Sequence, residues 1–297
     1  MSFTNDVKTE LCSIRQGAAL NFAECYGMLL FCKSFSFDEI KLQTGSKQAA
    51  ERFSYLLRTS FDIFPEIIQG GNKKPCYRVQ VTSLADVKKI MYHFGYKPQQ
   101  EITLQKSLLK TEGSQGAFLR GAFLSCGLVS DPNKEYRMDF SIKSEALAQE
   151  FKTLFVDKSI DFKITNRTNG YVVYTKKSEE IEDLLTLMGA GGETLNLINV
   201  KIYKSLRNKS NRINNFETSN IVKTANTAYI QRTAIEKWEK TGKLKTLPEE
   251  LYEVAMLRLE NPDLSLSALS KLSKTKLTRS GFNHRMTKLM EIIHKEA

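Results

Sequence analysis

The chain has 297 residues, with 44 Lys and Arg against 33 Asp and Glu and a formal net charge of +11 at pH 7. At roughly 100–200 residues per domain, this length predicts two or three domains that can each bury a core. Hydrophobic residues make up 41% and charged residues 26% of the chain. These values exclude a collagen, a wholly disordered chain and a small disulfide scaffold.

The positive charge is concentrated in the last third of the chain. Residues 1–195 contain 25 Lys and Arg and 23 Asp and Glu, a balance of +2, whereas residues 196–297 contain 19 and 10, a balance of +9. A basic segment of this size is typical of an anion-binding surface, and nucleic acid is the commonest large anion. General solubility charge is the alternative explanation.

The cysteines and the N-terminal residues indicate an intracellular protein. The five cysteines are odd in number and include no Cys-x-x-Cys pair, so they suggest neither a zinc ribbon nor a disulfide framework. Asp6 and Glu10 stand where a signal peptide would be basic and then apolar, and no later apolar stretch reaches the length of a membrane span. We expect a reduced, cytoplasmic and monomeric chain without membrane attachment, metal or cofactor.

An internal repeat organises residues 1–190. Apolar residues recur at helical spacing from 18 to 30 and again from 115 to 126, which predicts two helices. Each helix carries a glycine near its middle, Gly27 and Gly121, and the two are 94 positions apart. Because glycine costs about 1 kcal/mol relative to alanine inside a helix, the matched pair indicates a place where two backbones approach closely.

The segments that follow each helix also match, so both halves, about 1–97 and 112–190, are predicted to follow an α-β-α-β-β-α order. Alternating apolar and polar residues predict the strands, and turns at 70–72 and 169–170 separate the members of each pair. A further strand is expected after each pair. The expected strands are 37–44, 63–69, 76–82, 136–142, 161–167 and 171–176, and the expected helices are 47–61, 84–94, 145–157 and 179–188.

A basic segment, 191–217, follows a glycine-rich hinge at 189–192. Only amides and a few apolar residues separate its cations. This composition predicts a linker that contacts DNA phosphates, since such contacts position a protein without reading sequence. A solvated connector is the alternative. The candidate phosphate contacts are Lys201, Lys204, Arg207, Lys209 and Arg212.

The last segment, 218–297, is predicted to be an all-α domain. A long helix is expected from Thr218 to about Gly242, a second from Pro248 to Asn261, a short third after the capping residue Ser265, and a last one from about Arg279. The short third helix is expected to point Leu266, Leu269 and Leu272 inward, and the last helix carries one apolar stripe, made of Phe282, Met286, Leu289, Met290 and Ile293.

A tight basic turn before the last helix predicts a helix-turn-helix over about 264–295, whose last helix lies in the major groove of DNA. Any small helical bundle shows similar polar faces, so the surrounding lysines and arginines strengthen the prediction. For His284, a groove contact and a surface histidine are both open. The candidate DNA contacts are Lys274, Lys276, Arg279, Ser280, Asn283, His284, Arg285, Thr287 and Lys288.

The segment FLRGAFLSCG at 118–127 resembles the LAGLIDADG signature of homing endonucleases. That resemblance implies an α+β domain of two halves, in which the two signature helices pack side by side with glycines in the contact and saddle-shaped antiparallel sheets lie over DNA. It also implies an acidic residue at the end of each helix that holds a catalytic divalent metal.

This chain departs from that pattern at the acidic positions. Aligning the central glycines places Leu30 and Cys32 there in the first half, and Leu124 and Cys126 in the second. Neutral thiols do not hold Mg²⁺, which prefers oxygen ligands. The nearest acids, Glu24 and Asp131, are interpreted as surface or capping groups, since acidic residues prefer exposed positions. We therefore expect helices retained for packing and no nuclease activity.

Four ordered motifs resemble the WhiA family: FLRGAFLSCGLVSDP at 118–132, NRINNFETSNIVKT at 211–224, LRLENPDLSLSAL at 257–269 and SGFNHRMTKL at 280–289. The resemblance covers the whole chain. It implies a front part similar to homing endonucleases, a terminal helix-turn-helix similar to the fourth region of sigma factors, and DNA binding in sporulation transcription or in cell division and chromosome segregation. The chain departs from many members in having Phe216 in place of cysteine.

The leading hypothesis is a non-enzymatic, sequence-specific regulator that binds double-stranded promoter DNA and associates with the nucleoid. A metal-dependent homing-type endonuclease is the first alternative. The second is a scaffold whose front domain binds a transcription or division protein.

Overall fold

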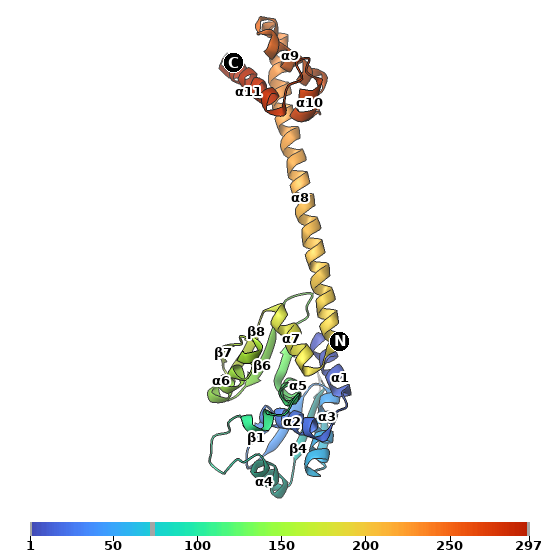
Figure 1. Ribbon diagram of the computed structural model, residues 1–297, viewed down its shortest axis with the longest axis vertical. Coiled ribbons are helices and arrows are strands. Elements are labelled where there is room, and N and C mark those ends of the chain that lie inside the picture. Colours follow the sequence, from blue (N-terminus) through green and yellow to red (C-terminus); the bar gives the residue numbers. More distant parts are fainter. Residues whose placement is uncertain (1, 72–74, 296–297) are drawn as a thin grey trace. The chain divides into compact units, whose positions relative to one another are not determined.

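The computed structural model describes residues 2–71 and 75–295, so Asn72 of the predicted turn at 70–72 lies outside the described residues. The chain forms two compact units, Met1–Lys204 and Ser205–Ala297 (Figure 1). The first unit contains all eight described strands together with α1 to α7. The second unit is helical.

The first unit consists of two halves that share the order helix, two strands, helix, two strands, helix. The first half comprises α1 (Phe3–Ser13), α2 (Ala18–Leu30), β1 (Ser34–Phe35), β2 (Ile40–Thr44), α3 (Lys47–Phe61), β3 (Glu66–Gly70), β4 (Cys76–Val81) and α4 (Leu84–His93). The second comprises η1 (Lys106–Leu109), α5 (Ser114–Cys126), β5 (Gly127–Val129), β6 (Met138–Ile142), α6 (Glu145–Thr153), η2 (Val156–Lys158), β7 (Lys163–Arg167), β8 (Gly170–Thr175) and α7 (Ser178–Met188).

Two antiparallel sheets with identical topology confirm the predicted duplication. Their strand orders are β1-β2-β4-β3 and β5-β6-β8-β7. The fourth strand of each sheet was expected after the predicted pair, and that expectation is wrong. It lies directly after the signature helix instead, as β1 and β5, which are only two and three residues long. Such short segments show no alternation that could reveal them.

Local sequence explains why the connecting helices start where they do. Ser46, Ser83 and Ser144 each precede a helix, and their hydroxyls accept hydrogen bonds from backbone N–H groups three residues on. Such caps satisfy donors that have no partner inside the helix. In the strands, β2 and β6 share the burial order of an alternating, half-buried strand, with the apolar side chains turned toward the helices.

The two signature helices, α2 and α5, are in direct backbone contact at their glycines. A Cβ atom added to Gly27 would lie 2.2 Å from the carbonyl oxygen of Phe118, and one added to Gly121 would lie 2.0 Å from that of Glu24. Real Cβ atoms do not approach an oxygen this closely, so neither position tolerates a side chain without a backbone shift. The expected close approach of the two helices is confirmed.

Glu24 occupies the centre of this helix pair and is fully buried, so its interpretation as a surface or capping group is wrong. Its two carboxylate oxygens accept hydrogen bonds from Arg52 Nε at 2.7 Å and from Arg120 Nε at 3.0 Å. Gln16 Nε2 donates to the same carboxylate at 2.7 Å. Because Arg52 lies on α3 and Arg120 on α5, one carboxylate of the first half joins elements of both halves.

The helix α8 (Gly191–Lys240) corrects the boundary predicted at Thr218. The segment 191–217, expected to be a linker, is helical throughout. No Pro interrupts it, and no Gly follows Gly192 until Gly242, so nothing breaks the i to i+4 hydrogen bonding even where apolar periodicity is weak. None of the described helices combines the length and the apolar character needed to cross a bilayer.

The second unit continues with η3 (Lys243–Thr246), α9 (Glu249–Glu260), α10 (Leu266–Leu272) and α11 (Arg279–Lys295). The three helices predicted after Pro248 are confirmed, and the Ser265 hydroxyl caps α10 by accepting from the backbone N–H of Ala268 at 3.2 Å. Of the three leucines expected to point inward from α10, Leu269 is buried, whereas Leu272 is 51% exposed.

We predict that replacing Gly121 with Ala destabilises the first unit by roughly 1–3 kcal/mol, because the new methyl group must displace the backbone of Glu24. Urea denaturation of the full chain, followed by circular dichroism, measures the change. Gly191→Ala is the matched control, since nothing lies within 4 Å of a Cβ atom there. Equal midpoints for the two variants would contradict the proposed contact.

We predict that Glu24→Gln costs roughly 3–5 kcal/mol of unfolding free energy, because it leaves two arginines without their buried counter-charge. Glu51→Gln is the control: it removes a carboxylate from the same half that pairs with Lys47 at 3.5 Å in solvent, and exposed pairs contribute at most about 1 kcal/mol. A loss of similar size in both variants would show that the buried network is not the cause.

Candidate nucleic-acid interface

The core of the second unit positions the helix-turn-helix. Ile235 and Trp238 of α8 pack with Val254 of α9, Leu269 of α10 and a buried stripe on α11. Four of the five residues predicted for that stripe are buried, and Met290 is partly buried. The stripe comprises Phe282, Met286, Leu289, Met290 and Ile293. Since one face of α11 is held in this core, the opposite face is presented to solvent.

Two residues that were not singled out in the sequence hold the helices in place. Glu253 of α9 accepts hydrogen bonds from the backbone N–H of Lys274 at 2.6 Å and from the Ser273 hydroxyl at 3.1 Å, which fixes the turn between α10 and α11. Arg258 is buried and donates to the carbonyl of Leu264 at 2.7 Å, just before α10. Neither has a sequence signal, because both resemble ordinary charged residues of an exposed helix.

The structure places the predicted DNA contacts together on α11 and on the turn before it. Eight of the nine side chains are exposed: Lys274, Lys276, Arg279, Ser280, Asn283, His284, Thr287 and Lys288. Thr278 caps α11, because its hydroxyl accepts from the N–H of Gly281 at 3.1 Å. The Thr287 hydroxyl donates to the Asn283 carbonyl at 2.9 Å, so its methyl group and lone pairs remain available at the surface.

Arg285 differs from the other eight. Its guanidinium lies 3.2 Å from the Glu250 carboxylate of α9, and its side chain is only 19% exposed. One of its nitrogens is buried and finds no acceptor among the described residues. Arg285, expected at the flank of the exposed face, is therefore tied to α9 through Glu250, and its contact with DNA stays a prediction.

The five cations predicted along residues 191–217 divide into two groups. Lys201 donates to the carboxylates of Glu179 at 2.7 Å and Glu182 at 3.0 Å, and Lys204 donates to the Pro132 carbonyl at 2.6 Å. The hydrogen bond from Lys201 lowers the pKa of Glu179 to about 2. These two lysines bond the first part of α8 to the rest of the first unit, and their predicted contact with phosphate stays a prediction. The others, Arg207, Lys209 and Arg212, are exposed on α8.

The ends of the signature helices carry the two thiols expected at the degenerate acidic positions. Cys32 is buried, and its Sγ donates to the Ser34 carbonyl at 2.8 Å. Burial raises the pKa of both Cys32 and Cys126 to about 12, so both thiols stay protonated near neutral pH. Among the described residues, no three His, Cys, Asp or Glu side chains are grouped to hold a metal ion.

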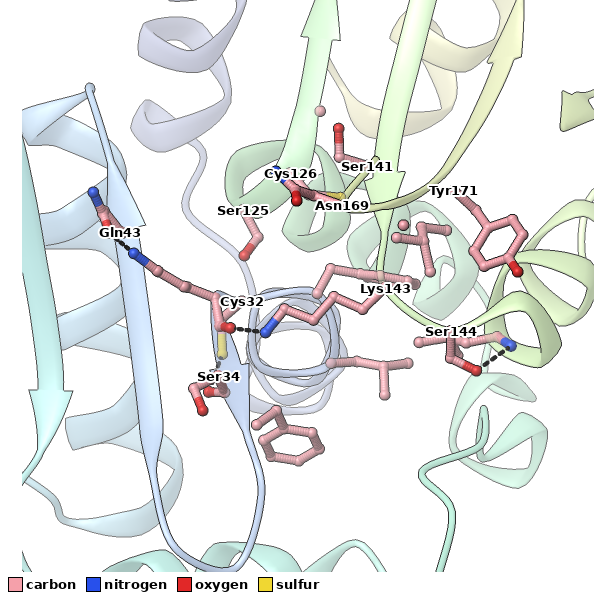
Figure 2. Close-up of a pocket in the computed structure, with 18 of the residues that line it drawn as sticks. Cys32, Ser34, Gln43, Ser125, Cys126, Ser141, Lys143, Ser144, Asn169 and Tyr171 are labelled. Carbon is pink, nitrogen blue, oxygen red and sulfur yellow. Dashed lines mark hydrogen bonds between the residues drawn. The ribbon is translucent and has the colours of Figure 1, made fainter. Parts of the chain in front are cut away.

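Both thiols line one large cleft of the first unit, with a volume of about 1030 Å³ (Figure 2). Hydroxyl and amide side chains from both halves surround it, including Ser34, Ser141 and Asn169. The cleft lining includes one acid from the second sheet, Asp139 of β6. Arg137 Nε donates a hydrogen bond to its carboxylate at 2.9 Å. The position that holds metal-binding carboxylates in the signature is therefore a polar cleft with neutral thiols at the helix ends.

Comparisons with known proteins match both units. The family model described as the WhiA LAGLIDADG-like domain matches residues 115–207, and the WhiA C-terminal HTH domain matches residues 210–293. Among solved structures, full-length DUF199/WhiA from Thermotoga maritima superposes with a TM-score of 0.62 at 23% identity over 99% of both chains. The N-terminal LAGLIDADG domain of DUF199/WhiA gives a TM-score of 0.50 at 19% identity, over 63% of this chain and 92% of that one. These likenesses confirm the predicted fold.

Sequence relatives extend the match over the whole length. A protein named "Probable cell division protein WhiA" from Ruminiclostridium cellulolyticum is 36% identical over 306 residues, which span 99% of this chain and 98% of its own. One of the same name from Clostridium acetobutylicum is 34% identical over 98% of this chain and 97% of its own. Since identity at this level extends along nearly the entire sequence, the chain belongs to the WhiA family.

Proposed function

We propose that the chain is a sequence-specific DNA-binding protein that regulates transcription in connection with cell division and chromosome segregation. The observation that carries the proposal is the solvent-facing polar and basic surface of α11, held in place by a buried stripe on its other side and by the Glu253 contact to the turn. The printed name of the relatives, a cell division protein, supports the cellular process.

The side chains on α11 match the chemistry of base recognition. In helix-turn-helix proteins, the N-terminal part of the second helix contacts base edges in the major groove. Arg279 and Asn283 lie in that part of α11 and suit guanine and adenine edges respectively, whereas the Thr287 methyl group suits thymine. Ser280, His284 and Lys288 complete the exposed surface. Arg285 has a different role here, because it orients α11 through Glu250.

The remaining cations are assigned to DNA phosphates. Lys274 and Lys276 are exposed in the turn, and Arg207, Lys209 and Arg212 are exposed on α8. Phosphate contacts position a protein and carry most of the salt dependence of binding, whereas base contacts carry specificity. We propose that the chain binds as a monomer in the cytoplasm, on the nucleoid. A single recognition helix then predicts a binding site without two-fold symmetry.

We predict that Arg279→Ala and Lys288→Ala each weaken binding to the preferred duplex by roughly 1–3 kcal/mol and relax the base preference at one position. The preferred duplex is selected with the full chain from a random-sequence pool, and affinity is measured by fluorescence anisotropy. Lys237→Ala, which removes an exposed cation of α8 that is not among the predicted DNA contacts, is the control and is expected to change little. An equal loss in all three variants would point to general charge rather than base reading.

The turn lysines are expected to act differently. Lys276→Ala weakens binding to preferred and random duplexes alike, and it lowers the slope of log affinity against log salt by about 0.9, the value for one released phosphate contact. The same anisotropy titrations at several salt concentrations measure this slope. A salt-independent affinity of the full chain for its preferred duplex would overturn the proposed function.

We further propose that the first unit does not cleave DNA. Protonated thiols at Cys32 and Cys126 supply no hard oxygen ligand for a divalent metal, and Glu24 is occupied by two arginines. Plasmid DNA incubated with the chain and Mg²⁺ or Mn²⁺ is therefore expected to remain supercoiled. Metal-dependent nicking that Asp139→Asn abolishes would contradict this, since Asp139 is the carboxylate on the second sheet that lines the cleft.

A further inference from the structure

The cleft between the two halves of the first unit has an unbalanced set of charges. Its lining includes four cations, Lys8, Lys33, Lys143 and Arg167, and only two acids. Asp139 pairs with Arg137, whereas Glu101 accepts a hydrogen bond from the neutral Ser144 hydroxyl at 3.2 Å and keeps its charge. The cleft therefore presents positive charge that its own carboxylates do not neutralise.

None of the four cations forms an ion pair within the part of the chain that the structure describes. Lys33 donates to the amide oxygen of Gln43, and Lys143 donates to the backbone carbonyl of Lys33. Lys8 donates to the carbonyl of Leu124 at 3.2 Å. Neutral acceptors satisfy donor geometry but leave the charge of each group uncompensated, which is the electrostatic condition of an anion site.

The cations surround the cleft from both halves. Lys33 follows α2, whereas Lys143 and Arg167 come from the ends of β6 and β7 in the second half. Figure 2 shows Lys143 reaching across from the second half toward the segment that contains Cys32 and Ser34. Lys8 lies buried on α1; burial lowers its pKa to about 8, so a large part of it remains charged at neutral pH.

The same cleft also offers apolar surface and hydroxyl groups. Phe35, Ile102 and Leu147 line it together with the ring of Tyr171. Sites for small organic molecules combine apolar walls with a few polar groups, usually in volumes of about 300–1,000 Å³, and this cleft is of that order. Cations and hydroxyls beside apolar walls suit a molecule that carries both phosphates and a flat ring.

We propose that this cleft binds a phosphorylated small molecule of the nucleotide class. The cations Lys33, Lys143 and Arg167 hold the phosphates, and the apolar wall near Tyr171 receives the ring. A small molecule is favoured over duplex DNA for two reasons. Residues 1–195 have a charge balance of only +2, which is weak for a duplex clamp. In addition, the cations stand beside apolar side chains such as Phe35 and Ile102, which suit a ring and not the phosphate backbone of a duplex.

Isothermal titration of the full chain tests the proposal with three probes: ATP without Mg²⁺, pyrophosphate, and adenosine. We expect saturable binding of ATP with a dissociation constant below about 1 mM. Pyrophosphate and adenosine are expected to bind more weakly, because pyrophosphate lacks the ring and adenosine lacks the phosphates. Absence of saturable binding for both ATP and pyrophosphate up to about 10 mM would overturn the proposal.

Variants assign the binding to the cleft. Lys143→Gln and Arg167→Gln each remove an exposed cation and are expected to weaken ATP about tenfold, as for a hydrogen bond to a charged group, while leaving adenosine unchanged. Ser141→Trp, which fills the cleft from its exposed strand face, is expected to weaken ATP and adenosine together. Lys88→Gln, an exposed cation on α4 outside the lining, is the matched control. Unchanged ATP affinity in the first three variants would overturn the assignment.

A competition experiment with duplex DNA tests whether the cleft binds DNA instead of a small molecule. If the selected duplex displaces ATP, and Arg167→Gln weakens the duplex as much as it weakens ATP, then the cleft is a DNA contact and the small-molecule proposal is wrong. Independent binding of ATP and duplex, with Arg279→Ala affecting only the duplex, supports the proposal. Because Arg279 lies in the second unit and Arg167 in the first, a variant of one residue can lose its binding activity while the other activity is kept. Failure of the small-molecule proposal is therefore distinguishable from failure of the proposed function.

Discussion

The backbone contact between α2 and α5 is the constraint on which the first unit depends. Gly27 and Gly121 face opposing carbonyl oxygens at distances that exclude any Cβ atom, and this contact sets how closely the two halves approach. The second sheet packs on α5, and α5 also contacts β2 of the first sheet, so the helix pair holds the two sheets in relation to each other and to the cleft between them. The helices have kept this constraint although the acids at their ends are absent, because packing depends on the glycines and metal binding depends on other positions.

A polar interaction accompanies the glycine contact. Glu24 is buried next to the crossing and holds Arg52 and Arg120, and Arg120 also donates to the Met188 carbonyl at the end of α7. An isolated buried carboxylate would be strongly unfavourable. Two cations from different elements compensate it only when α2, α3 and α5 are correctly placed. The network therefore ties the correct arrangement of the two halves to electrostatic balance as well as to shape.

The elements whose signals are local could be predicted from the sequence. The signature helices, the serine-capped helices and the stripe on α11 follow from spacing and capping, and they are confirmed with small shifts of their ends. Elements without such signals were not predicted. The strands β1 and β5 are too short to show an alternation of apolar and polar residues. The helix α8 continues through residues 191–217 because helix-breaking residues are absent, and not because the segment has a clear apolar face. The helix α1 was not expected either, although Val7 and Leu11 on it are fully buried.

The candidate sites were harder to predict because a charged residue looks the same in sequence whether solvent or a counter-charge surrounds it. Lys201, Lys204 and Arg285 were grouped with exposed cations, yet each bonds to a neighbouring element. Glu24 was assigned to the surface by the general preference of carboxylates, which fails when two arginines distant in sequence converge on it. The cations of the cleft were not predicted at all, since Lys33 is more than a hundred positions from Lys143 and Arg167 and only the fold brings the three together.

These differences follow from one physical distinction between the units. In the second unit, the residues assigned to base edges lie on the single helix α11, so helical periodicity in the sequence is enough to separate its buried stripe from its exposed face. In the first unit, the cleft lies between two halves and takes its side chains from the ends of several strands and helices. A site of that kind depends on tertiary packing, and hence on the glycine contact between α2 and α5. The same constraint that preserves the fold thus leaves the residues around the cleft free to change their chemistry, from metal-binding acids in the signature to neutral thiols and unpaired cations in this chain.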